Sequence, residues 1–339
     1  MCHNGFRMDA ACIGGNGSEG RTGTRVLTLL AAPLNGLILN ELAQGPRRLA
    51  ELRHETGSPP QTTLRTHLKQ LGEIGVVARR RLNLFPSIRE YHLTGLPGRE
   101  LRFVATTLEG WLANAPSEPL PVGSDAAQAA TKALVDGWSS TMLRALAPGP
   151  LTLGELNRAV GALGRPSIER RLTAMRLAGL VEPSIDAGDG TPYAVTEWLR
   201  RGVAPLAAAI RWERHHLPND TMPIAPLDAE AGFMLTAPLL RLPSELSGSC
   251  RLGVEFEDRG KHHLAGVTVV VEQGRVASWT TRLESGAAAW ANGPAAAWLR
   301  NTIEADPNRL ELGGDERLAL ALLDGLNRAL FGPISRPPP

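Results

Sequence analysis

The apolar residues between positions 39 and 77 recur in nearly the same order between positions 143 and 181. The two stretches align without a gap at an offset of 104 residues and share twelve identities in thirty-nine pairs. Most of the shared residues are leucine, glycine or proline, which fill a core or end a helix. A repeat of roughly a hundred residues is far longer than a solenoid unit. The pattern therefore predicts a small domain that occurs twice.

The first copy combines helical and strand patterns. Apolar residues from Leu64 to Ile74 recur at spacings of four, three and three, which predicts an amphipathic helix over 62–74 that ends at Gly75. The order of all the expected elements is that of a winged helix-turn-helix. These elements are helices over 37–44 and 49–56, the helix over 62–74, a hairpin with strands over 76–82 and 89–94, and a closing helix over 97–114.

The third helix of such a unit buries one stripe and leaves its other face free to enter a major groove about 12 Å wide. Hydroxyl and amide groups on that face suit base edges, and cations there and on the hairpin suit phosphates. The candidate DNA-binding residues of the first copy are Gln61, Thr62, Thr63, Arg65, Thr66, Lys69, Arg79, Arg80, Arg81 and Arg89.

The second copy repeats the plan with Ile168, Leu172 and Met175 turned inward. Its hairpin text, EPSIDAGDGTPY, carries three acids and no cation, so this wing is poorly suited to phosphate and the two copies are expected to contribute unequally. The candidate DNA-binding residues of the second copy are Arg165, Ser167, Arg170, Arg171 and Thr173, with Arg176 on the same face.

The last third of the chain changes to strand patterns followed by two helical ones. Strands are expected over GFMLTAPLLRL, SCRLGVEF, LAGVTVVVEQG and RVASWTTR, and helices over GPAAAWLRNTIE and DERLALALLDGLNRALF. Large apolar side chains in this part of the chain either line a ligand site or fill the core, and the sequence leaves both alternatives open. The candidate ligand-binding residues are Phe233, Met234, Trp279, Trp290 and Trp298.

These patterns predict an α+β protein with four segments. They are a disordered N-terminus (1–23), two tandem winged helix-turn-helix domains (24–115 and 125–217) and an α+β domain (225–333). Proline-rich stretches at 115–125 and 215–228 are the expected linkers. The second linker is where we expect a ligand bound in the last domain to affect DNA binding by the two repeats.

Charge separates these segments although the whole chain carries only +2. Residues 24–115 hold twelve Lys/Arg against seven Asp/Glu, 125–217 hold eleven against nine, and 218–339 hold eleven against fifteen. Basic repeats followed by an acidic domain indicate that the repeats meet a polyanion. The three cysteines make no disulfide framework, and neither a signal peptide nor a membrane span is evident, so we expect a cytoplasmic protein without membrane contact.

The stretches GPRRLAELR, PQTTLRTHLKQLGEIGVVARR and REYHLT, with GRELRF beyond, resemble HxlR-type winged-helix transcriptional regulators over 26–114, and the second copy resembles them more weakly. Members are usually homodimers on two half-sites, which implies that one chain here builds a pseudo-dimer through its closing helices, with a further homodimer left open. GVTVVVEQGRVASW and the tail GPAAAWL…LELGGDERLALALLDGLNRALF resemble sterol-carrier-protein-2-like (SCP2-like) domains, whose fold implies an apolar tunnel.

Other motifs have simpler explanations. GNGSEG at 15–20 lacks the strand before it that a dinucleotide-binding loop needs. Cys2, His3 and Cys12 lack a fourth metal ligand nearby, and a redox role for Cys12 rests only on relatives of the family. The adjacent histidines at 215–216 and at 262–263 are expected to be surface pairs. No catalytic constellation, cofactor motif or metal site is predicted.

The sequence therefore predicts a non-enzymatic transcriptional regulator whose two winged helices bind double-stranded DNA and whose C-terminal domain senses a small apolar or aromatic effector. One alternative is a lipid carrier or enzyme that acts through the C-terminal domain. Another is an architectural DNA-binding protein without an effector.

Overall fold

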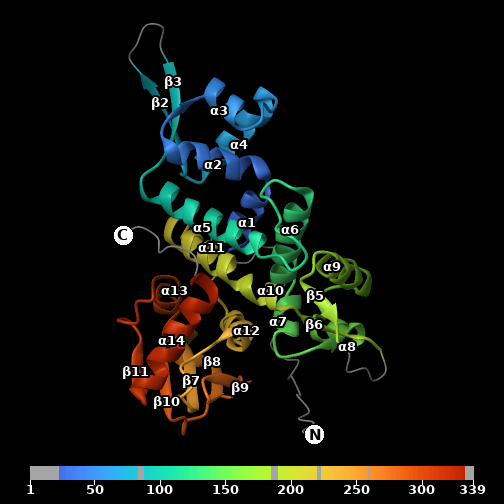
Figure 1. The fold of residues 1–339 in the computed structure, drawn as a ribbon, viewed down its shortest axis with the longest axis vertical. Helices are drawn as coiled ribbons and strands as arrows, with labels where there is room; N and C mark the ends of the chain where they lie inside the picture. Colours follow the sequence, from blue (N-terminus) through green and yellow to red (C-terminus); the bar gives the residue numbers. More distant parts are fainter. Residues whose placement is uncertain (1–22, 83–87, 185–189, 220–222, 259, 333–339) are drawn as a thin grey trace.

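The computed structural model describes residues 23–82, 88–184, 190–219, 223–258 and 260–332, which form a mixed α+β protein. We name its three parts the first module (24–113), the second module (125–216) and the C-terminal part (226–331). The first module lies at one end of the molecule and the C-terminal part at the other, with helices of the second module between and beside them (Figure 1).

The first module contains the predicted helices and hairpin. Leu64, Leu68 and Leu71 are buried on one side of the third predicted helix, which confirms the apolar stripe. Gly75, just beyond that helix, has a φ of 74°, a conformation that glycine adopts without a steric cost. The elements are α1 (Thr24–Ala31), α2 (Pro33–Gln44), β1 (Arg47–Arg48), α3 (Leu49–Glu55), α4 (Gln61–Glu73), β2 (Val77–Leu82), β3 (Ile88–Leu93) and α5 (Leu96–Ala113), with the antiparallel sheet order β1-β3-β2.

The second module repeats this order. The strand β4 and the helices α8 and α9 begin and end 104 residues after β1, α3 and α4. Ile168, Leu172 and Met175 are buried as predicted. The closing segment is broken at Gly202 into two helices, where the first module has one. The elements are α6 (Asp125–Ser139), α7 (Met142–Leu146), β4 (Leu151–Thr152), α8 (Leu153–Ala159), α9 (Arg165–Leu177), β5 (Val181–Pro183), β6 (Pro192–Val195), α10 (Glu197–Arg201) and α11 (Val203–His216), with the sheet order β4-β6-β5.

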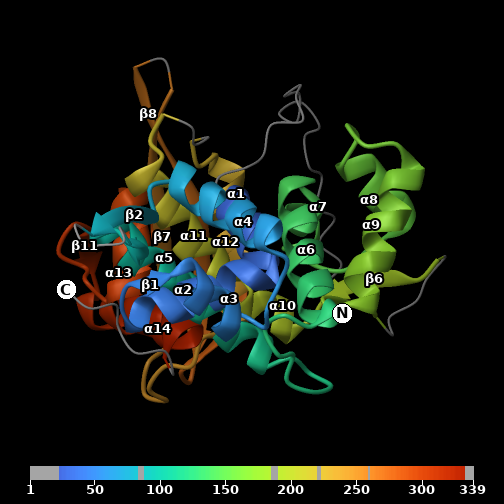
Figure 2. The same cartoon turned by 90° about the horizontal axis from the view of Figure 1, so that it is seen from above.

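The two modules pack through equivalent helices, α5 against α11 and α1 against α6 (Figures 1 and 2). At the end of α5, the indole of Trp111 stacks on that of Trp198 with ring centroids 4.5 Å apart and an interplanar angle of 10°. Each indole Nε1 donates to the other residue's carbonyl oxygen at 2.9 Å. At the start of α5, Trp212 Nε1 donates to the carbonyl of Pro97 at 2.9 Å. Helices α5 and α11 therefore run antiparallel, with a buried tryptophan fixing each end of the contact.

The start of α1 is capped from a distant helix. Helix α1 has no side-chain cap of its own, and the backbone N–H groups of Gly23 and Val26 donate to the carboxylate of Glu213 at 2.5 and 2.8 Å. Burial raises the pKa of the Glu213 carboxyl, and these hydrogen bonds partly oppose the rise. A carboxylate of α11 thus supplies the acceptor that helix N-termini need.

The C-terminal part is a mixed five-stranded sheet with the order β11-β10-β7-β8-β9, in which β10 runs parallel to β7 and the other pairs are antiparallel. Helices α12, α13 and α14 pack on this sheet and on one another. The elements are α12 (Pro226–Thr236), the 3₁₀ helix η2 (Ala237–Leu239), β7 (Gly248–Asp258), β8 (Lys261–Glu272), β9 (Arg275–Thr280), β10 (Ala289–Pro294), α13 (Ala295–Glu304), β11 (Glu311–Gly314) and α14 (Glu316–Phe331).

One predicted strand is wrong. The text GFMLTAPLLRL lies in the end of α12, in η2 and just beyond, and is not a strand. An apolar run buried on most sides has no periodicity that separates a helix from a strand. Pro226 in the first turn and the Asp228 carboxylate, which accepts from the N–H of Ala225 at 3.1 Å, are the local signals for a helix start in this segment.

The C-terminal part is attached to the second module by direct contacts. Arg144 of α7 and Asp228 of α12 form an ion pair of 3.1 Å in which both side chains are 11% exposed. Arg200 of α10 donates to two carbonyls of α12 at 3.3 Å, and Arg211 of α11 pairs with Glu304 of α13. The sequence predicts coupling through the segment 215–228, and these contacts connect the two parts outside that segment as well.

Candidate nucleic-acid interface and apolar cavity

Helix α4 presents one polar face to solvent, opposite the buried leucines. All six residues predicted on this face are exposed. The hydroxyl of Thr66 also donates to the carbonyl of Thr62 at 3.0 Å, and Lys69 lies 3.6 Å from Glu73 in an exposed ion pair. Such pairs contribute little and open readily for another anion. The residues are Gln61, Thr62, Thr63, Arg65, Thr66 and Lys69.

The hairpin of β2 and β3 sorts its arginines onto two faces. In its register Arg81 lies opposite Arg89, whereas Arg80 lies opposite Glu90. Directly opposed residues share a face and neighbours along a strand alternate. Arg79, Arg81 and Arg89 therefore share one face. Arg80 lies on the other and pairs with Glu90 at 3.4 Å, so the three consecutive candidate arginines at 79–81 do not lie on one face.

Between α4 and this hairpin runs a surface groove of about 600 Å³. It has four cationic side chains and no carboxylate among its lining residues, and apolar atoms from Leu49, Leu68 and Tyr91 form part of its wall. The cations come from α4, β2 and β3, so the fold collects charges up to 24 residues apart. They are Arg65, Lys69, Arg79 and Arg89.

Helix α9 of the second module has a weaker set. Arg165, Arg170 and Thr173 are exposed, and Arg165 pairs with Glu169 at 3.0 Å. Ser167 and Arg171 are half-buried and hydrogen-bond to each other, which makes them less available than predicted. At the 104-residue offset, Glu169 takes the place of Arg65 and Pro183 that of Arg79.

An apolar cavity of about 120 Å³ lies where α11 meets the C-terminal part. Phe233 of α12 and Trp298 of α13 meet there edge to face, with ring centroids 4.9 Å apart. Trp298 is fixed by an indole hydrogen bond of 2.8 Å to the carbonyl of Gly253. The wall facing them is α11 itself, through Val203, Leu206, Ala207 and Ile210.

Three of the five predicted lining residues lie elsewhere. Met234 is buried next to Phe233 on α12 but does not line the cavity. Trp279 lies on the edge strand β9, and Trp290 of β10 packs across Gly313 with the Arg251 guanidinium 5.7 Å from its ring centroid. The sequence had placed the ligand site inside the C-terminal domain, whereas a wall from α11 could not be predicted without the packing of the parts.

The structure confirms some of the predictions for cysteines and histidines and contradicts others. Cys2, His3, Cys12 and the motif at 15–20 lie outside the described residues. Burial raises the pKa of the Cys250 thiol to about 12, so it is not a nucleophilic thiolate. The surface pair at 262–263 is exposed, as predicted. His216 is only 11% exposed and lies against Glu100, so that part of the surface-pair prediction is wrong.

No single helix among the described residues is long and apolar enough to cross a membrane, although the bent pair α1 and α2 together meets the criteria of length and composition.

Comparison with known proteins identifies the first module. Residues 29–118 match the family described as HxlR-like helix-turn-helix. Among solved structures, diamide-treated YodB from B. subtilis is 32% identical over 28% of this chain and 92% of its own, with a TM-score of 0.26. The reduced form of the transcriptional regulator YodB from B. subtilis is 31% identical over 29% of this chain and 93% of its own, with a TM-score of 0.26. No curated protein matches the chain.

Proposed function

Because residues 29–118 belong to the HxlR-like helix-turn-helix family of DNA-binding transcriptional regulators, we propose that this protein binds duplex DNA with both modules of one chain and responds to a small apolar ligand. The observation that carries the DNA-binding part is the groove between α4 and the hairpin, with four cations and no acid in its lining. A phosphate backbone fits such a groove while the polar face of α4 meets base edges.

Base contacts are assigned to α4 because its exposed face carries hydroxyls, an amide and Arg65. Threonine and glutamine side chains and the arginine fork form hydrogen bonds to base edges in a major groove about 12 Å wide. The hairpin arginines are assigned to phosphates or the minor groove, since a cationic strand pair has no base-specific donor pattern of its own.

The second module is assigned a different and weaker DNA contact. Its helix α9 has the same place in the element order as α4, and Arg165, Arg170 and Thr173 are exposed on it. An acid, Glu169, replaces the arginine equivalent to Arg65, and the wing begins with Glu182 and Pro183. Two non-equivalent helices favour an asymmetric operator rather than a palindrome.

Packing of equivalent helices supports an intramolecular pseudo-dimer. Homodimeric regulators place two reading helices through a symmetric contact. Here α5 on α11 and α1 on α6 supply contacts of that kind within one chain. The reciprocal hydrogen bonds of Trp111 and Trp198 are two-fold in form although the residues occupy different places in the two modules.

Replacing Arg65 with alanine is expected to relax sequence preference more than it lowers non-specific binding. A good base contact contributes about 1–3 kcal/mol of discrimination. The measurement is site selection from random duplexes, followed by competition with random DNA at fixed salt. Arg102→Ala, which removes an exposed arginine of α5 outside the groove, is the charge-matched control. Unchanged site preference in the Arg65 variant would count against α4 as the recognition helix.

The effector part of the proposal is supported by the shared cavity. A ligand there touches α11, the helix that packs on α5 and so links the two modules. A ligand alters DNA affinity only through a preference between two arrangements of the modules. The SCP2-like resemblance and a sheet covered by helices agree with small-molecule binding by the C-terminal part. A carrier or enzyme would bind ligand equally well and leave DNA affinity unchanged.

A cavity-filling substitution tests the effector site. Gly232 of α12 lines the cavity, and a Cβ at that position meets no atom within 4 Å, so Gly232→Leu should fill the space without strain. Benzene, which occupies a cavity of roughly 150 Å³ in another protein, is the probe. We expect it to raise the melting temperature of the full-length protein but not of the Gly232→Leu variant.

Gly154→Leu, at an exposed helical glycine of α8 with no Cβ contact closer than 4.0 Å, is the matched control and should respond like the unmodified protein. Apolar and aromatic compounds that stabilise the protein are then added to it on its operator. A change of about tenfold in affinity, near 1.4 kcal/mol, is expected. Tight ligand binding with unaltered operator affinity would favour the carrier or enzyme alternative.

A further inference from the structure

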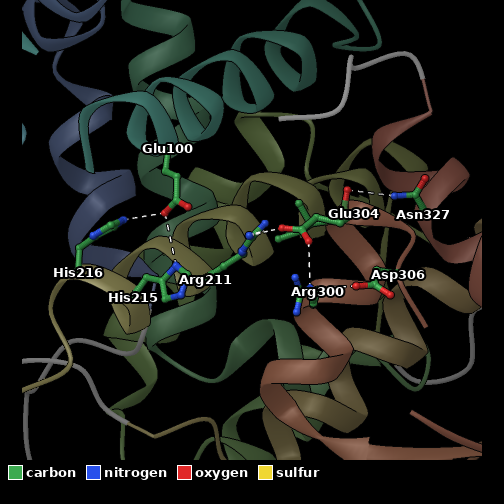
Figure 3. Close-up of polar contacts among 9 residues, drawn as sticks. Glu100, Arg211, His215, His216, Arg300, Glu304, Asp306 and Asn327 are labelled. Carbon is green, nitrogen blue, oxygen red and sulfur yellow. Dashed lines mark hydrogen bonds and ion pairs between the residues drawn. The ribbon is translucent and has the colours of Figure 1, made fainter. Parts of the chain in front are cut away.

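Three potential metal ligands converge where the two modules meet. Glu100 lies near the start of α5, and His215 and His216 are the last two residues of α11. His216 Nε2 lies 2.6 Å from Glu100 Oε2, and His215 Nδ1 lies 3.5 Å from the same oxygen (Figure 3). One ligand atom from each residue falls within 4.8 Å of the other two.

The register of the two helices creates this convergence. Helices α5 and α11 are antiparallel, so the first turns of α5 meet the last turn of α11. The indole of Trp212, one turn before His216, is hydrogen-bonded to Pro97 at 2.9 Å and packs 5.0 Å from the His216 ring. These contacts hold the His216 imidazole against α5 and toward the Glu100 carboxylate.

We propose that Glu100, His215 and His216 form a binding site for a divalent transition metal of the zinc class. Imidazole nitrogen and carboxylate oxygen are ligands that zinc takes, and three protein ligands with a fourth position left to water is a common set. Two ligands on one tetrahedral zinc ion lie about 3.4 Å apart. The His215 contact already has that spacing, and the His216 contact opens by less than an ångström to reach it.

The charges around the site are compatible with a cation. Arg211 precedes His215 by one helical turn, but its guanidinium is paired with Glu304. Glu304 also forms an ion pair with Arg300, with its Oε2 3.2 Å from Arg300 Nε. The same nitrogen lies 3.1 Å from Asp306 Oδ2 (Figure 3). The charge of Arg211 is thus directed to α13, and Arg214, which precedes His215 directly, is exposed to solvent. His215 is 59% exposed, which gives an ion access from solvent.

Bound metal would join the first and second modules at the end of the α5–α11 contact opposite the Trp111–Trp198 pair. A ligand that binds only the folded arrangement stabilises it in proportion to its saturation. Metal would therefore fix the spacing of the two modules. The site itself stands whether or not the protein binds DNA.

Zinc titration of the full-length protein tests the site. Cys2 and Cys12 are replaced by serine in every variant, so that thiolates of the N-terminal segment cannot bind the ion. Competition with a chromophoric chelator is expected to show one zinc ion per chain, and zinc should raise the melting temperature. Cobalt substituted for zinc should give visible d–d bands without thiolate charge-transfer absorption.

The variants locate the ion. Glu100→Gln and His216→Ala should each weaken zinc binding at least tenfold, since even changes behind the ligands cost 10–100-fold in affinity. His215→Ala should do the same, and because that side chain is mostly exposed it does so without a cost to folding. His262→Ala with His263→Ala removes the other adjacent pair, exposed on β8, and should leave zinc binding unchanged.

Absence of stoichiometric zinc binding at micromolar free zinc would overturn the proposal. So would unaltered affinity in folded His215→Ala and Glu100→Gln variants, or loss of the ion only when the pair at 262–263 is removed.

Discussion

Alanine at Arg79, Arg81 and Arg89 together is expected to lower DNA affinity by about 10²–10³-fold at 0.1 M salt on every duplex sequence. These three arginines share one face of the hairpin, and two of them line the groove against α4. Each phosphate contact contributes about 0.9 to the slope of log affinity against log salt. The slope should therefore flatten by about 2.7 if all three contact phosphate.

The neighbouring Arg80 is the matched control for this experiment. It is an exposed arginine of the same strand, but it lies on the other face and pairs with Glu90. Arg80→Ala should change affinity and salt slope much less than a single substitution of Arg79. Fluorescence anisotropy of labelled duplexes at several salt concentrations measures both quantities. Equal effects of Arg79→Ala and Arg80→Ala would mean that the groove face is not the phosphate-binding face.

Replacing Trp198 with alanine is expected to reduce the free energy of unfolding by about 3–5 kcal/mol. The substitution removes a buried, stacked indole and one of the two N–H donors to the carbonyl oxygen of Trp111, which keeps the backbone N–H of Asn114 at 3.2 Å. Trp198→Phe keeps an aromatic ring but loses the N–H, so a smaller loss of about 1–3 kcal/mol is expected. Urea unfolding followed by far-ultraviolet circular dichroism measures these differences.

A double-mutant cycle separates the junction from general core packing. Because the two indoles stack on each other and each donates to the other residue's backbone carbonyl, the variant with both Trp111→Ala and Trp198→Ala should lose clearly less stability than the sum of the single variants. Trp290→Ala removes a half-buried tryptophan of β10, remote from the junction, and should add to either change independently. Additive losses at Trp111 and Trp198 would show that these residues do not act as one contact.

Local structure in the first module was predictable because its signals lie within a few residues of one another. The spacing of Leu64, Leu68 and Leu71 marks the buried stripe of α4, and the stripe by itself leaves the opposite face to solvent. Gly75 and Gly179, both with a φ of 74°, end α4 and α9 at equivalent places. The offset of 104 residues likewise predicted where α9 begins and ends.

Sequence patterns within a few residues did not predict the structure where an element is buried on most sides, because no polar face then marks its periodicity. The end of α12 is apolar on most sides because it packs between the sheet and other helices. Its sequence pattern therefore predicted a strand instead of a helix. The face of a strand arginine also needs the register of its partner strand. Only that register separated Arg80, opposite Glu90, from Arg79 and Arg81.

The sequence by itself therefore determined the repeated order of elements, the polar face of α4 and the basic wing. The tertiary structure alone decided the sites between parts of the chain. Glu213 accepts a hydrogen bond from Gly23, 190 residues earlier at the start of α1, Trp111 meets Trp198, and His216 meets Glu100. The cavity wall formed by α11 likewise depends on the packing of separate parts of the chain. Such contacts depend on how two helices cross and slide against each other, and that relation is set by packing of the whole interface rather than by any local pattern.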